Sequence, residues 1–261
     1  MSARVGQGAA QATIDLSGQV ALVTGGGRGI GRVIAEALLE AGCVVVVCGR
    51  SRPEAAPEHG GRRAEFVQCD VRAADQVRLL VDGVVERHGR LDIVVNNAGG
   101  SPFADASTAS PRFSEAIVAL NLLAPLHVAQ AAWRHMEGQV EGGCIVNICS
   151  VSGVRPSPGT AAYGAAKAGL INLTQSLAME WGPKIRVNAV IVGLIATEGA
   201  LDHYGAGHDA ISQALPLKRM GAGQDIANAV LYLASPLASY VSGARLSVDG
   251  GGERPSFLDL V

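Results

Sequence analysis

Residues 20–43 read VALVTGGGRGIGRVIAEALLEAGC, the pattern of a β-strand, a glycine-rich turn and an α-helix. The apolar run stops at the glycines, and the apolar residues after them recur at the spacing of a helix. Gly25, Gly29 and Gly31 obey G-x-x-x-G-x-G, and glycine permits a positive φ and a close backbone approach. The helix that follows offers free N–H groups and the positive end of its dipole. The turn therefore predicts a binding site for a pyrophosphate, with a turn that binds no ligand as the alternative.

Strand and helix patterns alternate along the rest of the chain. The apolar runs are rich in β-branched residues, as strands buried on both faces of a parallel sheet require. This alternation predicts an α/β fold of three layers, with a doubly wound parallel sheet between two layers of helices. We expect one domain over residues 18–261, preceded by a flexible leader over residues 1–17. Further strands are expected at 43–50, 64–71, directly before 96–99, at 144–150, 185–193 and near 244–251, and further helices at 73–88, 112–136, 160–181 and 224–234.

The composition of the 261 residues favours small-molecule chemistry. Lys and Arg number 21 against 23 Asp and Glu, so no excess of positive charge marks a surface for nucleic acid or for an anionic membrane. The five cysteines contain no C-x-x-C motif and fall mostly in apolar runs, so we expect reduced thiols packed in the core of a cytoplasmic protein. We expect no metal site, no signal peptide and no run of about 20 apolar residues that would span a membrane.

The end of the second strand bears on the choice between NAD and NADP. An enzyme that uses NAD usually places an acidic residue there to bind the ribose 2′-hydroxyl, whereas a nearby arginine accommodates the 2′-phosphate of NADP. This strand ends in Gly49 and Arg50 without an acid, and Arg28 lies in the glycine turn. Two guanidiniums suit a phosphate dianion, so NADP(H) is favoured. NAD(H) is the alternative if both arginines are only solvated loop charges.

Polar residues also stand near the ends of the third and fourth strands, where open α/β sheets bind ligands. Asp70 is expected either to accept a hydrogen bond from an adenine amino group or to cap the next helix. The sequence NNAG at 96–99 is either a ligand-binding segment or a simple turn. Asn121 lies in a long apolar helix shortly before Pro125, which leaves a backbone carbonyl near 121 without its usual partner. A buried asparagine in such a helix needs a structural or catalytic role.

Residues 150–167 read SVSGVRPSPGTAAYGAAK and contain the best candidates for catalysis. If the second half of this stretch is helical, Tyr163 and Lys167 lie one turn apart on the same face. An unperturbed tyrosine has a pKa of about 10, and a neighbouring ammonium group lowers that pKa. Ser150, at the end of the fifth strand, supplies a hydroxyl that could hold a substrate oxygen. The alternative for the pair is an aromatic anchor beside a solvated charge.

Taken in order, these motifs resemble those of the short-chain dehydrogenases/reductases over nearly the whole chain. The resemblance implies a Rossmann fold with a seven-stranded sheet, a nicotinamide cofactor and a catalytic tetrad of Asn121, Ser150, Tyr163 and Lys167. The matching pieces are TGGGRGIG (24–31), CDV (69–71), NNAG (96–99), Asn121, Ser150, YGAAK (163–167), IRVNAV (185–190) and VDGG (248–251).

The resemblance also implies a role for each member of the tetrad. Tyr163 would be the acid–base residue, and Ser150 would hold the substrate oxygen. Lys167 would lower the pKa of the tyrosine and bind the nicotinamide ribose. Asn121 would hold a water molecule in a proton relay.

The cofactor contacts and the assembly follow from the same resemblance. Family members usually carry Pro-Gly after the sixth strand, where this chain has Val192 and Gly193, while Thr197 still matches. A homotetramer is expected, as is common in the family, and the apolar helices at 112–136 and 160–181 have more apolar surface than one face of a sheet covers. The expected cofactor contacts are Gly25, Arg28, Gly29, Ile30, Gly31, Arg50, Asp70, Val71, Asn97, Ala98, Gly99, Tyr163, Lys167, Gly193 and Thr197.

Together these features predict an oxidoreductase that favours NADP(H) and interconverts a ketone and a secondary alcohol. A catalytically silent, nucleotide-sensing binding protein on the same fold is the alternative, and the complete tetrad argues against it. Residues 153–160 and 194–218 are expected to select the substrate, with a 3-oxoacyl thioester, a steroid and a cyclic ketone all open. Apolar candidates in the second segment are Leu194, Ile195, Leu201, Tyr204, Ile211 and Leu215, and Arg155, His203 and His208 would either meet an anionic tail or be surface residues.

Overall fold

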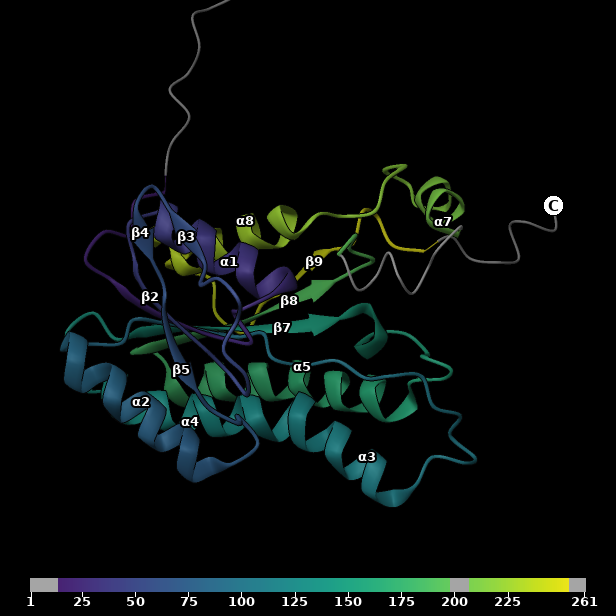
Figure 1. Cartoon of the computed structure of the whole chain (residues 1–261), viewed down its shortest axis with the longest axis horizontal. Helices are drawn as coiled ribbons and strands as arrows, with labels where there is room; N and C mark the ends of the chain where they lie inside the picture. Colours follow the sequence, from purple (N-terminus) through teal and green to yellow (C-terminus); the bar gives the residue numbers. More distant parts are fainter. Residues whose placement is uncertain (1–13, 198–206, 254–261) are drawn as a thin grey trace, which may run out of the picture.

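The computed structural model of the chain describes residues 14–197 and 207–253 and contains a seven-stranded sheet (Figure 1). The strand order is β5-β2-β1-β6-β7-β8-β9, and every neighbouring pair is parallel. The predicted doubly wound parallel sheet of seven strands is confirmed. The order reverses between β1 and β6, which places a ligand crevice at the carboxyl ends of these two strands. The strands are β1 (Val20–Thr24), β2 (Val44–Gly49), β5 (Glu65–Gln68), β6 (Ile93–Asn96), β7 (Gly143–Ser150), β8 (Ile185–Val192) and β9 (Arg245–Val248).

Helices cover both faces of the sheet, with α1 and α8 on one side and α2, α4 and α5 on the other (Figure 1). Alternate residues of the inner strands point to opposite faces, so each face has its own core. Ala21 and Val23 of β1 pack in the core under α1 and α8, and Leu22 packs in the core under α2 and α4. The helices are α1 (Gly29–Glu40), α2 (Ala74–His88), α3 (Pro111–Val118), α4 (Ala124–Met136), α5 (Ala161–Trp181), α7 (His208–Ala214) and α8 (Gly223–Ala234).

Two elements were not predicted from the sequence. A short hairpin joins β3 (Glu58–His59) to β4 (Arg62–Arg63) through two glycines at positive φ, and all four strand residues are exposed. Helix α7 lies in a stretch that we expected to be irregular. Both elements are short and carry no long apolar pattern, so hydrophobic periodicity gives no signal for them.

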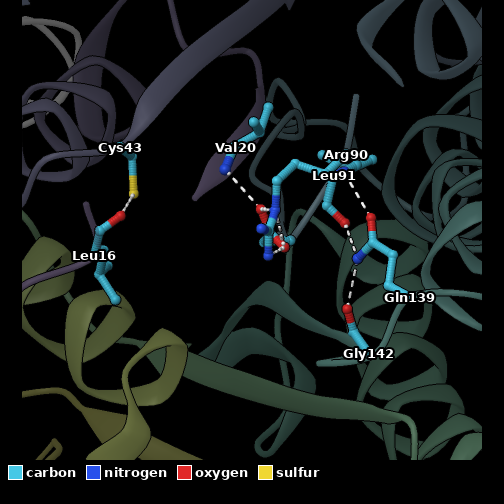
Figure 2. Close-up of polar contacts among 8 residues, drawn as sticks. Leu16, Val20, Cys43, Arg90, Leu91, Gln139 and Gly142 are labelled. Atoms are coloured by element: carbon cyan, nitrogen blue, oxygen red, sulfur yellow. Dashed lines mark hydrogen bonds and ion pairs between the residues drawn. The ribbon is translucent and has the colours of Figure 1, made fainter. Parts of the chain in front are cut away.

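The boundary of the predicted leader was wrong by a few residues. Leu16 is 1% exposed and belongs to the core under α1. Its N–H donates to the Ala41 carbonyl at 2.7 Å, and its own carbonyl accepts from Cys43 Sγ at 3.7 Å (Figure 2). The folded part of the chain therefore begins before residue 18, and residues 1–13 of the expected leader lie outside the described residues.

Hydrogen bonds tie the sheet together at the amino ends of its strands (Figure 2). The buried carboxylate of Asp92 accepts the Val20 N–H at 2.8 Å, and Arg90 Nη2 lies 2.8 Å from the other carboxylate oxygen. The Gln139 side chain accepts the Leu91 N–H at 3.0 Å and donates to the Leu91 carbonyl at 3.0 Å. These contacts join the starts of β1 and β6 to the connection between α4 and β7. We call Arg90, Asp92 and Gln139 the amino-edge cluster.

The helix predicted over 112–136 is interrupted near its middle. A π-helical turn, Ala119–Leu123, separates α3 from α4, and the Ala124 N–H donates to the Ala119 carbonyl. Pro125 has no N–H to offer the carbonyl of Asn121, so the chain takes a wider turn there, as π-bulges do.

The same run, Pro111–Met136, is long and apolar enough to pass as a membrane span by length and composition, with a mean hydropathy of 1.5. From the sequence we expect no run of about 20 apolar residues that would span a membrane, so this segment differs from that expectation. A core helix passes this test as well, and Val128, Ala132 and Met136 of α4 are buried against the sheet. The packing therefore accounts for the apolar composition of α4.

Candidate functional site

The glycine turn between β1 and α1 needs its glycines for two different reasons. Gly25 and Gly29 have φ of +65° and +53°, which side chains other than hydrogen disfavour. A Cβ on Gly31 would lie 2.3 Å from Asn97 Nδ2, so close packing excludes a side chain there. A Cβ on Gly29 would meet nothing within 4 Å, because the turn is open on that side.

The start of α1 fits an anionic group. Its N-cap residue, Arg28, makes no side-chain capping hydrogen bond, and the first turn contains no acidic residue. The orphan N–H groups of the first turn therefore have no side-chain partner at the cap, which is the condition for binding a pyrophosphate. Ile30 turns toward the core and is partly buried there, so its side chain anchors the turn.

Thr24 organises the crevice, and sequence reasoning missed it. Thr24 is 2% exposed. Its hydroxyl accepts hydrogen bonds from the N–H groups of Asn97 and Ala98, both at 3.0 Å. Asn97 returns a hydrogen bond from Nδ2 to the Thr24 carbonyl at 2.9 Å. The side chain of Asn97 thus braces the glycine turn against β6. The position of a threonine directly before the glycines was the only signal in the sequence.

The region expected to hold the adenosine end of a cofactor contains exposed arginines and a carboxylate that is paired with an arginine. Arg28 and Arg50 are both exposed, and Arg52 lies over the Phe66 ring at 5.5 Å from its centroid. Asp70 forms an ion pair with Arg72 at 2.6 Å, and this hydrogen bond lowers the pKa of the carboxyl group.

Asp70 does not cap α2, because the N-cap residue of that helix is Ala73. The capping alternative was therefore wrong. Val71, the next expected contact, is 7% exposed and packs in the core beneath this surface.

Asn121 lies in the π-helical turn and is fully buried. Its Nδ2 donates to the carbonyls of Gly100 and Ile117, both at 3.0 Å, and its Oδ1 accepts the Gly100 N–H at 2.9 Å. Both ends of the amide are used, so the side chain holds the segment after β6 in place.

The remaining three members of the expected tetrad meet at the carboxyl end of β7. The Ser150 hydroxyl lies close enough to Tyr163 to lower the pKa of the phenol. Lys167 is 3% exposed, its Nζ donates to the Ile148 carbonyl at 2.8 Å, and it lies 5.7 Å from the centroid of the Tyr163 ring. A Cβ on Gly99 would be 2.7 Å from Asn121 Oδ1 and 3.2 Å from Lys167 Nζ, so that glycine leaves room for Asn121 and Lys167 to lie close together.

The expected effect of Lys167 on the tyrosine is absent in the free protein. Burial raises the pKa of Tyr163, and the Ser150 hydroxyl offsets this only in part. Burial also lowers the pKa of Lys167, whose ammonium group faces the ring and a carbonyl. The tyrosine therefore keeps its proton at neutral pH, and its hydroxyl can act as a proton donor.

The segment after β8 departs from the family pattern at Val192, which pairs with Val248 of β9 and is 6% exposed. A Cβ on Gly193 would lie 2.5 Å from the Cα of Asp249, and its N–H donates to the Val248 carbonyl at 3.0 Å. The valine therefore continues the sheet, and the glycine is required by packing. Thr197 is the last described residue before the gap, and its N–H donates to the Ile195 carbonyl at 3.0 Å.

Two hollows lie near the expected substrate segments. A cavity of about 70 Å³ is formed by the segment after β6, the start of α3 and the start of α5. A second cavity, of about 270 Å³, is formed mainly by Leu194, Ile195 and Leu217 and by the glycines after β9. Leu215 is buried, whereas Leu201, His203, Tyr204 and the side chain of His208 lie outside the described residues.

All five cysteines are free and buried, as the sequence predicted. Cys149 packs against Leu170 and Ile171, away from the hydroxyl of Ser150, and burial raises its pKa to about 11. In the described parts of the chain, no group of three His, Cys, Asp or Glu side chains could hold a metal ion.

Comparisons with known proteins agree with this geometry. A family model described as enoyl-(acyl carrier protein) reductase matches residues 25–253. A 7alpha-hydroxysteroid dehydrogenase of Clostridium sardiniense is 40% identical over 90% of this chain and 94% of its own length. A 3-oxoacyl-[acyl-carrier-protein] reductase of Chlamydia trachomatis is 36% identical over 90% of this chain and 98% of its own length. The crystal structure of a short-chain type dehydrogenase/reductase from Mycobacterium marinum superimposes with a TM-score of 0.84, at 34% identity over 93% of this chain and 98% of that one.

Proposed function

The chain belongs to the short-chain dehydrogenase/reductase family of oxidoreductases, and on that premise we propose that it interconverts a ketone and a secondary alcohol with NADP(H) as the favoured cofactor. One observation carries the proposal. Asn121 and Lys167 flank Gly99, and the Tyr163 ring lies beside Lys167 with Ser150 near it, at the same edge of the sheet as the uncapped start of α1. A cofactor bound at α1 would extend toward these groups, because both lie at the carboxyl ends of the central strands.

The nicotinamide, when bound, supplies or accepts the hydride. In ketone reduction, the Tyr163 hydroxyl donates a proton to the carbonyl oxygen, and the Ser150 hydroxyl holds that oxygen by a hydrogen bond. Lys167, whose Nζ lies 5.7 Å from the centroid of the Tyr163 ring, would bind the nicotinamide ribose and stabilise the phenolate once the cofactor is bound. Asn121 fixes the backbone of Gly100, and so positions the wall of the crevice that faces the tetrad.

The preference for NADP(H) rests on the arginines at the end of β2 and in the glycine turn. Within the described residues, the guanidinium groups of Arg28 and Arg50 make no hydrogen bond. The nearest acid that follows β5, Asp70, is already paired with Arg72. A 2′-phosphate would find two free cations here, and a ribose 2′-hydroxyl would find no free carboxylate at the strand end.

The proposed substrate is apolar around its carbonyl. The cavity formed by the segment after β6 and the starts of α3 and α5 is lined mostly by small side chains, with Ala104, Ala109 and the single aromatic ring of Phe113 among them. Named relatives act on a steroid or a 3-oxoacyl thioester, and both classes fit an apolar lining. The test is a panel of ketones, 3-oxoacyl thioesters and hydroxysteroids, followed through the absorbance of the reduced nicotinamide. Cofactor binding without turnover of any compound would instead support the nucleotide-sensing alternative.

We also propose a cytoplasmic homotetramer with one folded domain. Leu123 and Met179, which flank the packed surfaces of α4 and α5, are 42% and 86% exposed in the single chain, as expected for helices that pack against other copies. The five free cysteines suit a reducing compartment. Sedimentation at micromolar concentration tests the assembly, and a monomer would contradict it; cell fractionation tests the location.

A further inference from the structure

Arg155 makes an ion pair that joins two distant parts of the chain, one of which is the turn that follows Ser150. Its Nη2 donates to Glu253 Oε1, across 98 residues of sequence, and its Nη1 donates to the Pro156 carbonyl at 2.9 Å. The two side chains are 37% and 41% exposed. Pairs this exposed contribute only about 0–1 kcal/mol to stability. Fold stability therefore gives little reason for this arginine to be held here.

The position of Arg155 is fixed relative to the tetrad. It closes the turn that begins at Ser150, and its N–H donates to the Val151 carbonyl at 3.1 Å. The turn is pressed against α5, because a Cβ on Gly153 would lie 2.8 Å from the Lys167 carbonyl carbon and a Cβ on Gly164 would lie 2.8 Å from the Ser152 carbonyl oxygen. Arg155 therefore lies at the end of the turn that follows Ser150. This turn packs closely against the part of α5 that contains Tyr163 and Lys167.

Glu253 directly follows a run of three glycines. Gly250, Gly251 and Gly252 are consecutive and have φ of +70°, +96° and +79°. The first two glycines also border the larger cavity, together with Leu194 and Leu217. This segment has no side chains of its own to pack, and it is held by backbone hydrogen bonds such as that from the Leu217 N–H to the Gly250 carbonyl at 3.2 Å.

We propose that the substrate carries an anionic group, a carboxylate or a phosphate, and that Arg155 binds this group in place of the Glu253 carboxylate. The proposal rests on the proposed ketone reductase function and names a substrate class for it. An arginine pairs with both kinds of anion by charge-assisted hydrogen bonds, and a carboxylate oxygen already accepts from Nη2 of Arg155. The ketone would then face Tyr163 while the anion binds Arg155.

The test compares keto acids of increasing chain length with their methyl esters, and hydroxyketone phosphates with the parent hydroxyketones. Wild type should show a higher kcat/KM for one anionic series than for its neutral partners, and the series that benefits identifies the anion. Arg155→Gln should reduce the anion-to-neutral ratio of kcat/KM about tenfold, through KM. Glu253→Gln should raise that ratio, because the competing carboxylate is gone.

Arg78→Gln is the matched control, because it removes an exposed arginine from α2 and changes the net charge equally. An unchanged ratio in Arg155→Gln, or an equal fall in Arg78→Gln, would overturn the proposal while leaving ketone reduction intact. If no compound is reduced, the proposed function fails. Calorimetric binding of the anions to protein loaded with NADP(H) then decides, and equal affinity of wild type and Arg155→Gln rejects the role of Arg155.

Discussion

The two edges of the central sheet treat polar groups in opposite ways. At the amino ends of the strands, the amino-edge cluster pairs its charges and amides with each other and with backbone groups of β1 and β6 (Figure 2). At the carboxyl ends, α1 starts without a side-chain cap, and Arg28 and Arg50 extend into solvent. The first edge satisfies its donors internally, and the second keeps donors available for a ligand.

Burial sharpens this comparison. Asp92 is 6% exposed and Lys167 is 3% exposed, so each edge contains one deeply buried charged residue. Asp92 is surrounded by its counter-ion Arg90 and a backbone N–H. Among the described residues, Lys167 donates a single hydrogen bond, to the Ile148 carbonyl, and burial lowers its pKa. From this difference we infer that the buried charge of Asp92 stabilises the fold and that the buried charge of Lys167 serves the chemistry. The variants below test these two roles separately.

Removing the tyrosine hydroxyl should have the largest effect. Tyr163→Phe should lower kcat about 10³-fold, because the proton donor is lost, while cofactor affinity stays near that of wild type. Lys167→Ala should reduce both turnover and cofactor affinity. Turnover is measured with the best ketone of the panel, and affinity by fluorescence titration. Tyr240→Phe, at a residue that is fully exposed, is the control. Activity of Tyr163→Phe within tenfold of wild type would contradict the mechanism.

At the opposite edge, Asp92→Ala should cost stability and leave the chemistry alone. The buried Val20 N–H and the Arg90 guanidinium would lose their partner, which should lower the free energy of unfolding by about 3 kcal/mol. Urea denaturation measures the loss, and kcat/KM of the folded protein should match that of wild type. Asp75→Ala, which removes a 95% exposed carboxylate, should stay within about 0.5 kcal/mol. A large loss of kcat in Asp92→Ala would contradict the claim that the amino edge contributes to stability alone.

The parts that the sequence predicts well are those written in local patterns. The glycines after β1, the β-branched strands and the helical spacing of Tyr163 and Lys167 each depend on neighbours within a turn or a strand. The parallel, doubly wound sheet then follows from the alternation of strands and helices, whereas the tetrad was expected from the resemblance to the family. Pro125 likewise signals a disturbed helix, although not that the chain would widen into a π turn.

The parts that it misses depend on distant contacts. Ile14 and Leu16 are two large apolar residues in an otherwise mostly polar stretch, and only the fold shows that both pack under α1. Thr24 becomes important because β6 delivers two N–H groups to its hydroxyl. The spacing of Tyr163 and Lys167 places them on one face, but the direction of the tyrosine pKa depends on how deeply the ring is buried. Burial is a property of the whole packed layer.

The pH dependence should follow from that burial. Because the pKa of Tyr163 is raised, the phenol is protonated at neutral pH and the phenolate is scarce. Ketone reduction uses the protonated form, so its kcat should be level through neutral pH and fall only in the alkaline range. Alcohol oxidation uses the phenolate, so its kcat should rise with pH by up to about tenfold per unit. Rates in both directions at saturating cofactor measure this. An oxidation rate that is already level at pH 7 would mean that the bound cofactor lowers the tyrosine pKa.

The smallest effect expected concerns the two exposed arginines of the carboxyl edge. A charge-assisted hydrogen bond contributes about 1.5–3 kcal/mol where it is well formed, and solvent and salt reduce that value. Even half of it corresponds to about a tenfold preference for NADPH over NADH in kcat/KM. Arg50→Ala should narrow the preference more than Arg28→Ala, because Arg50 directly follows the end of β2, where the ribose 2′ position is recognised. Comparing both coenzymes at low and high salt tests this, with Arg78→Ala as a control for net charge. Equal or better use of NADH by wild type would show that these arginines are only solvated charges. In that case the two unpaired guanidiniums at the carboxyl edge would not bind a 2′-phosphate.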